Sequence, residues 1–230
     1  MRVLGRTGPP LLIVGGHDPL GASGVLADLR ALEGLSLWPL VVVSALTEQP
    51  QRVVAAPLFA QSLEQALSIR PAAIKVGMLA NAAQAALVTR LVGKIPLVLD
   101  PVLAASSGLR LYRSAPQTLR GLIAKATLVT PNTGEATTLA AILAHASAVL
   151  YKGGHAAGAR VRDVLEPHGL VFTTQRRPYA VRGTGCALAT RIAAELALGH
   201  GLADAVARAE RWLHRAYARA NILSPLGQRG

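Results

Sequence analysis

The segment Gly183-Thr184-Gly185-Cys186 combines residues that can surround an anion with the only cysteine of the chain. The two glycines allow a tight turn that brings several backbone N–H groups together. A helical pattern follows, and the start of a helix adds free N–H groups and the positive end of its dipole. There we expect the thiol pKa of Cys186 to be lowered, so that the thiol acts as a base or polariser. The segment predicts a phosphoryl-binding anion hole, although a glycine turn beside a small buried cysteine would have the same sequence.

Three further segments carry polar side chains where strands are expected to end. Asn132 and Glu135 in TPNTGE could hold Mg²⁺ through water, or they could cap a helix. Lys152 in YKGGH could neutralise phosphate oxygens, or it could end a strand beside a turn. Asp100 in LDP could approach a metal or a phosphate-bound water, or it could occupy a turn before proline. Together these segments favour phosphoryl transfer without a Walker motif, because no G-x-x-x-x-G-K-[ST] occurs in the chain.

Apolar runs of strand length alternate with helical patterns along the chain. The expected strands are 11–16, 40–46, 73–79, 96–102, 126–130, 148–151, 161–165 and 170–174. The expected helices are 25–35, 57–69, 82–92, 116–124, 134–145, 184–198 and 202–220. Strands that are hydrophobic throughout and alternate with helices indicate an α/β three-layer sandwich with a mostly parallel central sheet. No linker divides the sequence, so we expect one domain over 1–230, with its ligands beyond the carboxyl ends of the strands.

The composition narrows the class of protein. The net charge of +12 invites a nucleic-acid interpretation, but the arginines are scattered and few aromatic residues could stack on bases. The single cysteine excludes an internal disulfide framework, and no apolar run approaches the ~18–20 residues of a membrane span. The N-terminal apolar stretch is short and has no signal-peptide cleavage site, so we interpret it as a buried strand. We therefore expect a cytoplasmic protein that binds a small molecule rather than nucleic acid or membrane.

Seven segments occur in an order and at spacings typical of one family. They are GGHDPLGASGVLADLRAL, VSALTEQ, IKVGML, VLDPVLAASSG, VTPNTGEA, VLYKGGH and GTGCALATRIAAELALG. The chain resembles the hydroxymethylpyrimidine/phosphomethylpyrimidine kinases of thiamine biosynthesis, in the ribokinase-like superfamily, over about 11–220. The resemblance implies a ribokinase-like fold, ATP and Mg²⁺. It also implies phosphorylation of 4-amino-5-hydroxymethyl-2-methylpyrimidine, of its monophosphate, or of both, and it suggests a homodimer.

The resemblance also assigns roles to individual positions. By position in the family pattern, Cys186 corresponds to the family's catalytic cysteine. The residues that correspond to the family's anion hole are Gly183, Thr184 and Gly185. The pyrimidine-contacting positions correspond to Asp28, Gln49 and Met78, with Gly16 and Val102 nearby. The nucleotide and metal region corresponds to Asn132, Lys152 and Asp100, with Glu135 toward the metal. Gln49 and Asp28 suit an aminopyrimidine edge chemically, since an amide both donates and accepts hydrogen bonds and a carboxylate accepts them.

Departures from the family pattern keep alternatives open. Bulkier residues occupy the loop after the first strand, where Leu20 and Ser23 replace smaller residues, and TEQPQRVV lacks the family's flap ending. The segment between Glu135 and Lys152 is also shorter than usual. One alternative is a kinase for a related ring alcohol of the pyridoxal type. Another is a degenerate kinase homologue that binds the pyrimidine as a sensor or partner subunit.

Overall fold

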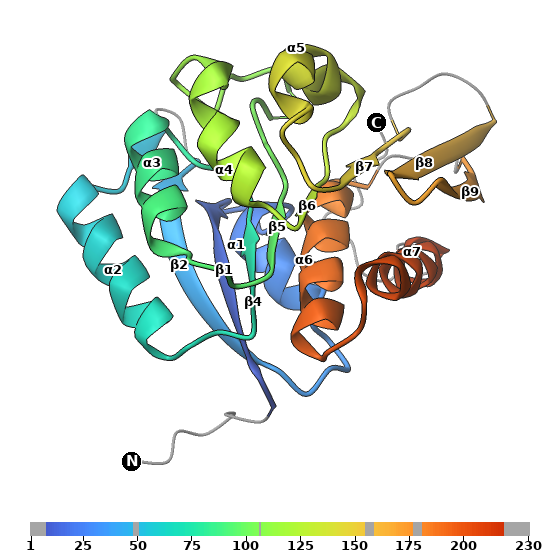
Figure 1. Cartoon of the computed structure of the whole chain (residues 1–230), viewed down its shortest axis with the longest axis horizontal. Helices are drawn as coiled ribbons and strands as arrows, with labels where there is room; N and C mark the ends of the chain where they lie inside the picture. The colour runs from blue at the N-terminus through green and yellow to red at the C-terminus, as the bar shows by residue number, and fades with distance from the viewer. Residues whose placement is uncertain (1–7, 48–50, 106, 155–158, 177–180, 219–230) are drawn as a thin grey trace.

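The structure is a computed structural model that describes residues 8–47, 51–105, 107–154, 159–176 and 181–218. Within these residues one nine-stranded sheet has the order β3-β2-β1-β4-β5-β6-β7-β8-β9 (Figure 1). The strands are β1 Pro10–His17, β2 Trp38–Leu46, β3 Arg52–Val53, β4 Ala73–Val76, β5 Leu97–Leu99, β6 Leu128–Val129, β7 Val149–Tyr151, β8 Arg160–Glu166 and β9 Leu170–Gln175. The six central strands of this order, β2-β1-β4-β5-β6-β7, pair with one another in parallel. The outer strands β3, β8 and β9 pair with their neighbours antiparallel.

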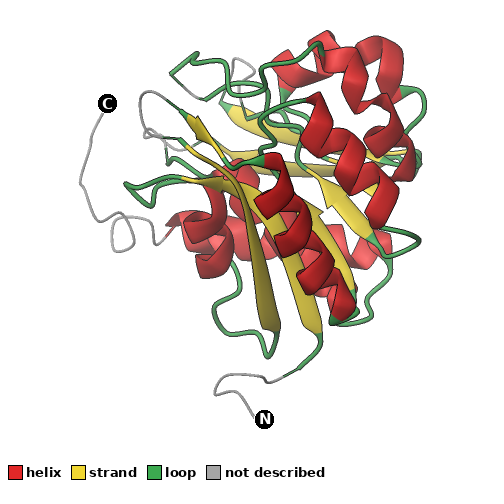
Figure 2. Ribbon diagram, turned by 90° about the vertical axis from the view of Figure 1, so that its left-hand side faces the viewer, coloured by secondary structure: helices red, strands yellow, loops and turns green. Residues whose placement is uncertain are grey.

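Helices cover both faces of the sheet (Figure 2). The helices are α1 Gly24–Arg30, α2 Ala56–Ser68, α3 Ala82–Leu91, α4 Arg120–Lys125, α5 Thr133–Leu143, α6 Thr184–Ala197 and α7 Leu202–Ala218, and a short 3₁₀ turn spans Pro116–Leu119 before α4. Helices α2 to α5 share one hydrophobic core with the sheet, and α1, α6 and α7 share a second core on the opposite face. This arrangement confirms the predicted α/β sandwich.

Strand β1 shows why the central strands are hydrophobic throughout. Its side chains alternate between the two cores: Leu12 and Val14 pack on one side, and Leu11 and Ile13 pack on the other. All four have no solvent exposure. A strand with polar residues on one face could not occupy this central place between β2 and β4.

The predicted elements are confirmed in order and type, with boundaries that shift by a few residues at most positions. Helix α1 is shorter than expected, and β4, β5 and β6 end before the apolar runs do. Strand β3 was not predicted, because its two residues are too few to give a pattern. Among the described helices, none is long and apolar enough to cross a membrane.

Candidate active site

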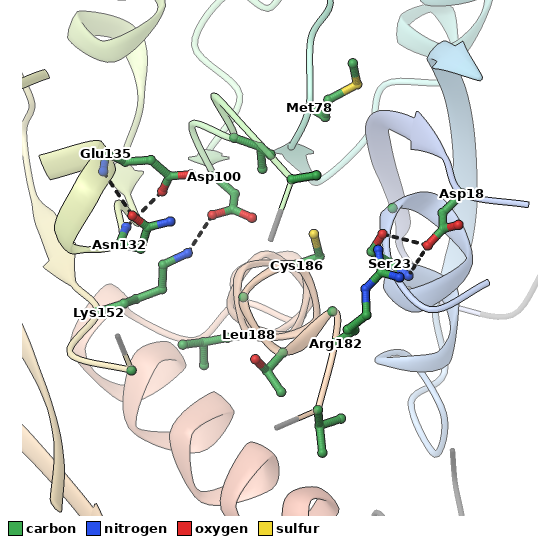
Figure 3. Close-up of a pocket in the computed structure, with 18 of the residues that line it drawn as sticks. Asp18, Ser23, Met78, Asp100, Asn132, Glu135, Lys152, Arg182, Cys186 and Leu188 are labelled. Carbon is green, nitrogen blue, oxygen red and sulfur yellow. Dashed lines mark hydrogen bonds and ion pairs between the residues drawn. The ribbon is translucent and has the colours of Figure 1, made fainter. Parts of the chain in front are cut away.

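A cavity of about 950 Å³ lies at the carboxyl ends of the parallel strands. It is lined at its centre by the start of α6, and polar side chains from the loops after β5, β6 and β7 face that helix (Figure 3). Met78 and Gly16 line one end, while β8, β9 and α7 contribute Val161, Thr174 and Leu213 to the other. The cavity therefore brings the loops that the sequence predicted to converge into a single space.

Gly183 sets the turn into α6. Its backbone adopts φ +82, and a Cβ atom there would collide with the carbonyl oxygen of Ala22. Glycine is required at this position on both grounds. The following residues form the first turn of α6, where backbone N–H groups lack intrahelical acceptors and the helix dipole is positive. Gly183, Thr184, Gly185 and Cys186 all line the cavity, as an anion-binding segment would require.

The expectation of a lowered thiol pKa at Cys186 is wrong in this structure. Burial raises the pKa of Cys186 to about 12, and the carboxylates of Asp100 and Asp28 raise it further. Lys75 and a hydrogen bond from the Gly24 amide act in the opposite direction. Cys186 is only half-buried at the cavity wall, and the protein around it still favours a neutral thiol at neutral pH over the thiolate that the helix start would favour.

An ion pair joins the ends of β5 and β7 beside the helix start. Lys152 Nζ lies 2.7 Å from Asp100 Oδ1, and Thr130 donates a 3.2 Å hydrogen bond to the same oxygen. Burial alone would raise the pKa of Asp100, but Lys152 and Lys75 hold it below its usual value. A Cβ atom at Gly185 would lie 3.1 Å from Lys152 Nζ, so the ammonium group reaches the first turn of α6.

Asn132 and Glu135 form a capping box at the start of α5. The Glu135 amide donates to Asn132 Oδ1 at 2.9 Å, and the Asn132 amide donates to Glu135 Oε2 at 2.8 Å. The capping alternative is therefore present, and both side chains still line the cavity. Burial and the nearby Asp100 raise the pKa of Glu135 to about 7, against the effects of Lys152 and of hydrogen bonds from backbone amides.

The other end of the cavity is apolar around Met78 and Val102, which both line it. Met78 is held by Ser44, whose hydroxyl donates to its carbonyl oxygen at 2.7 Å. Gly16 faces the same side chain, since a Cβ atom there would lie 2.8 Å from Met78 Sδ. Met78 and Val102 thus offer apolar side chains against which the face of a ring could pack.

The structure places one predicted ring contact, Asp28, away from this end. Asp28 is completely buried and does not line the cavity. Its carboxylate instead binds Lys75 and accepts a 2.7 Å hydrogen bond from Thr190. Because these two groups occupy the carboxylate, this structure does not place Asp28 where it could contact a ring in the cavity. Gln49 lies outside the described residues.

Two features of the cavity were not predicted from the sequence. Lys75 lines the cavity although it sits in the buried strand β4, and a charged residue within an apolar run was the available signal. Asp163 and Glu210 form an acidic pair at the far end, and their separation in sequence gave no signal. Asp18, a carboxylate at the end of a predicted strand, shapes the loop before α1, where it accepts hydrogen bonds from the Ser23 amide and hydroxyl at 3.0 and 2.8 Å (Figure 3).

Comparisons with known proteins identify the family. The profile described as phosphomethylpyrimidine kinase matches residues 18–226. The hydroxymethylpyrimidine/phosphomethylpyrimidine kinase of Mycobacterium tuberculosis is 37% identical, covering 91% of this chain and 88% of that protein. The thiamine biosynthesis multifunctional protein of Corynebacterium glutamicum is 33% identical over 94% of this chain, and the chain spans 32% of that longer protein.

The fold is also that of solved kinases. The pyridoxal kinase of Staphylococcus aureus in complex with pyridoxal has a TM-score of 0.78 and 26% identity, and the match covers 90% of this chain and 86% of that one. The same enzyme in complex with AMP-PCP has a TM-score of 0.79 and 25% identity, covering 90% and 87%. The architecture is ribokinase-like, and the chain belongs to the phosphomethylpyrimidine kinase family.

Proposed function

We propose that this chain transfers the terminal phosphoryl group of ATP to 4-amino-5-hydroxymethyl-2-methylpyrimidine, to its monophosphate, or to both, with the monophosphate step as its main reaction. The family it belongs to is one of kinases. One observation carries the proposal: a single cavity joins the α6 turn and Lys152 to the apolar end at Met78. A phosphoryl group held at the turn would thus lie between a ring at Met78 and a nucleoside at the β8 end.

In this reaction the protein mainly positions groups and stabilises charge. The backbone amides from Gly183 to Cys186 would bind the transferring phosphoryl oxygens, and Lys152 would neutralise their charge. Cys186 begins as a thiol, so it would donate a hydrogen bond to a phosphoryl or hydroxyl oxygen, and it could accept a proton only after losing its own. Its high pKa favours the polarising role over that of a base that is ready at neutral pH.

The donor set fits Mg²⁺ held largely by nucleotide phosphates. Within the described residues no group of three or more histidine, cysteine, aspartate or glutamate side chains could form a metal cage. Mg²⁺ usually binds through one or two carboxylates plus substrate phosphates. Glu135 would take that role, directly or through water, with Asp100 nearby. Bound there, the ion would neutralise charge on the phosphates.

ATP use also supports a cytoplasmic location for the protein. The homodimer that the family resemblance suggests stays a prediction.

A second substrate class is a pyridoxal-type ring alcohol. It is favoured by the fold likeness to the Staphylococcus aureus pyridoxal kinase at 26% identity. The apolar contacts around Met78 would accept either ring, and Gln49, which would help to choose between them, lies outside the described residues.

The test is an ADP-release assay on the purified protein with Mg-ATP. The pyrimidine alcohol, its monophosphate and pyridoxal would be compared by kcat/KM. We expect the monophosphate to be the best substrate. Preferential turnover of pyridoxal would favour the second class. Binding of the pyrimidine monophosphate without ADP release would overturn the kinase proposal in favour of a sensor.

A further inference from the structure

An unpartnered carboxyl oxygen lies at the end of the cavity where β8, β9 and α7 meet (Figure 1). Glu210 of α7 lines the cavity there, although the residue is only 7% exposed. Its Oε1 atom is buried, and no hydrogen bond from the described part of the chain reaches it. A buried acceptor without a donor costs free energy, so a ligand that brings a hydroxyl or amino group to this oxygen would be favoured.

The neighbouring Asp163 leaves one oxygen of Glu210 available. Asp163 of β8 is also buried, and its Oδ1 accepts a 2.7 Å hydrogen bond from the Gly153 amide. A hydrogen bond joins the two carboxyl groups, and such a bond requires one shared proton. Burial and Asp163 raise the pKa of Glu210 to about 8, so Glu210 holds that proton at neutral pH. One proton serves one oxygen of Glu210, and the other oxygen remains an acceptor.

Packing alone does not account for an acid at position 210. Val206 and Leu213 lie four and three residues from Glu210 along α7, so the three share one face of the helix. Val206 belongs to the core that α1, α6 and α7 share, and Leu213 packs against it. An apolar side chain at 210 would continue this face without burying an acceptor. The carboxyl group is therefore better explained by its place in the cavity than by the fold.

The acidic pair lies beside the residue that we expect to neutralise the phosphates. Gly153, whose amide binds Asp163, directly follows Lys152 in the chain. Two carboxyl groups that share one proton keep a negative charge, which would repel a phosphate at this place. The ligand group here should therefore be uncharged, should donate hydrogen bonds and should lie next to the phosphates in the nucleotide. The ribose of ATP has these three properties, because its 2′ and 3′ hydroxyl groups lie between the phosphates and the base.

We propose that Glu210 binds the ribose of the nucleotide by accepting a hydrogen bond from its 2′ or 3′ hydroxyl group. The assignment rests on the proposed use of ATP as the phosphoryl donor. Asp163 is a positioning residue, because its bonds to Glu210 and to the Gly153 amide fix the orientation of the acceptor. The base would pack against Val161 and Leu213, which line the same end of the cavity. Glu210 thus distinguishes a ribonucleotide from a nucleotide that lacks the hydroxyl group.

Nucleotide binding tests the proposal without relying on kinase activity. Isothermal titration calorimetry in the presence of Mg²⁺ would give the Kd of the unmodified chain for ADP, 2′-deoxy-ADP and 3′-deoxy-ADP. We expect loss of the hydroxyl that Glu210 binds to raise Kd about tenfold, a typical effect of leaving a buried acceptor unpaired. If both deoxynucleotides bound as tightly as ADP, the proposal would be wrong. This comparison needs no variant.

Two substitutions assign the effect to Glu210. Glu210→Met removes the acceptor and keeps an unbranched side chain of similar length. We expect this variant to bind ADP about tenfold more weakly and to bind all three nucleotides with the same Kd. Glu210→Gln keeps a carbonyl oxygen for the ribose and gains an amide donor for Asp163, so it should still prefer ADP. Circular dichroism would check that both variants are folded, and a folded glutamine variant without this preference would contradict the assignment.

Glu64→Met is the matched control, because Glu64 is an exposed residue of α2 that does not line the cavity. We expect it to leave all three Kd values unchanged. Weakening of all three nucleotides by one factor in Glu210→Met would overturn the ribose contact, since the preference for ADP would then not depend on Glu210. Hydroxyl-dependent ADP binding without phosphorylation of the pyrimidine or its monophosphate would refute only the proposed function. Phosphorylation with equal Kd values for the three nucleotides would refute only the role of Glu210.

Discussion

Lys152 Nζ lies 2.7 Å from Asp100 Oδ1, and this pair stands at the ends of two strands that are not neighbours in the sheet. Strand β6 separates them, and Thr130 at its end donates to the same aspartate oxygen. Asp28 and Lys75 form the other buried pair. Two carboxylates thus hold two ammonium groups that line the same cavity as the start of α6, so an anion in the cavity would meet fixed positive charges as well as neutral amides.

Replacement of Lys152 by methionine tests the role of its charge. We expect Lys152→Met to lower kcat/KM by about 10²–10³, a loss typical of removing one group that stabilises developing charge. Because Asp100 would then be buried without its oppositely charged partner, we also expect a loss of stability of about 3–5 kcal/mol. ADP release and urea denaturation would measure the two effects. Lys94→Met is the matched control, since Lys94 is exposed and should change neither value.

Replacement of Cys186 separates a chemical role from a packing role. We expect Cys186→Ala to lower kcat by about 10²–10⁴, the range of a positioned proton donor or acceptor. Cys186→Ser keeps a donor of similar shape and should retain more activity than the alanine variant. If the alanine variant turned over as fast as the unmodified chain, the thiol would have no part in the reaction.

The order and type of most elements follow from the sequence because the central strands are continuous apolar runs and the helices that separate them have their own periodicity. Local signals also located Asn132 and the turn at Gly183. The partner of Asp28 could not be predicted, since Lys75 and Thr190 reach it across 47 and 162 residues of chain. The thiol pKa of Cys186 was predicted to be lowered, and the structure raises it. The sequence shows that the thiol lies at the start of a helix, but it does not show which groups surround the thiol in the fold.

We expect Glu135 to contribute to the reaction by holding Mg²⁺. Glu135→Gln keeps the capping box, because glutamine suits the same position, so α5 should form as before. We expect the Mg²⁺ concentration for half-maximal rate to rise about tenfold or more at saturating ATP. A magnesium titration of ADP release would measure it. If that concentration were unchanged in a folded variant, Glu135 would be only a capping residue.

Gly183 is required by the turn. Gly183→Ala would place a methyl group against the Ala22 carbonyl in a left-handed backbone conformation. We expect a loss of at least about 1–3 kcal/mol and weaker ATP binding. Thermal melting and nucleotide titration would measure these changes. Gly201→Ala is the control variant, because a methyl group at Gly201 would meet open space. We expect its melting temperature and its ATP affinity to equal those of the unmodified chain.

The acidic pair at the far end predicts a pH-dependent stability. Burial and the nearby Asp163 raise the pKa of Glu210 to about 8 from its usual value of 4.5. Between these values the folded chain keeps a proton that the unfolded chain has lost, so this group makes stability fall as pH rises. Glu210→Gln mimics the protonated form. Urea denaturation would give the free energy of unfolding of both proteins at pH 6 and at pH 9. We expect the stability of the variant minus that of the unmodified chain to be larger at pH 9 than at pH 6 by a few kcal/mol. An identical pH slope in both proteins would refute the shift.

The most direct test of the central claim is to identify the product made from the pyrimidine monophosphate. The purified chain would be incubated with Mg-ATP and the monophosphate, and the mixture followed by ³¹P NMR and mass spectrometry. We predict the diphosphate and ADP in equal amounts, with both reduced in Cys186→Ala. Tight binding of the monophosphate with ATP left intact would contradict the account.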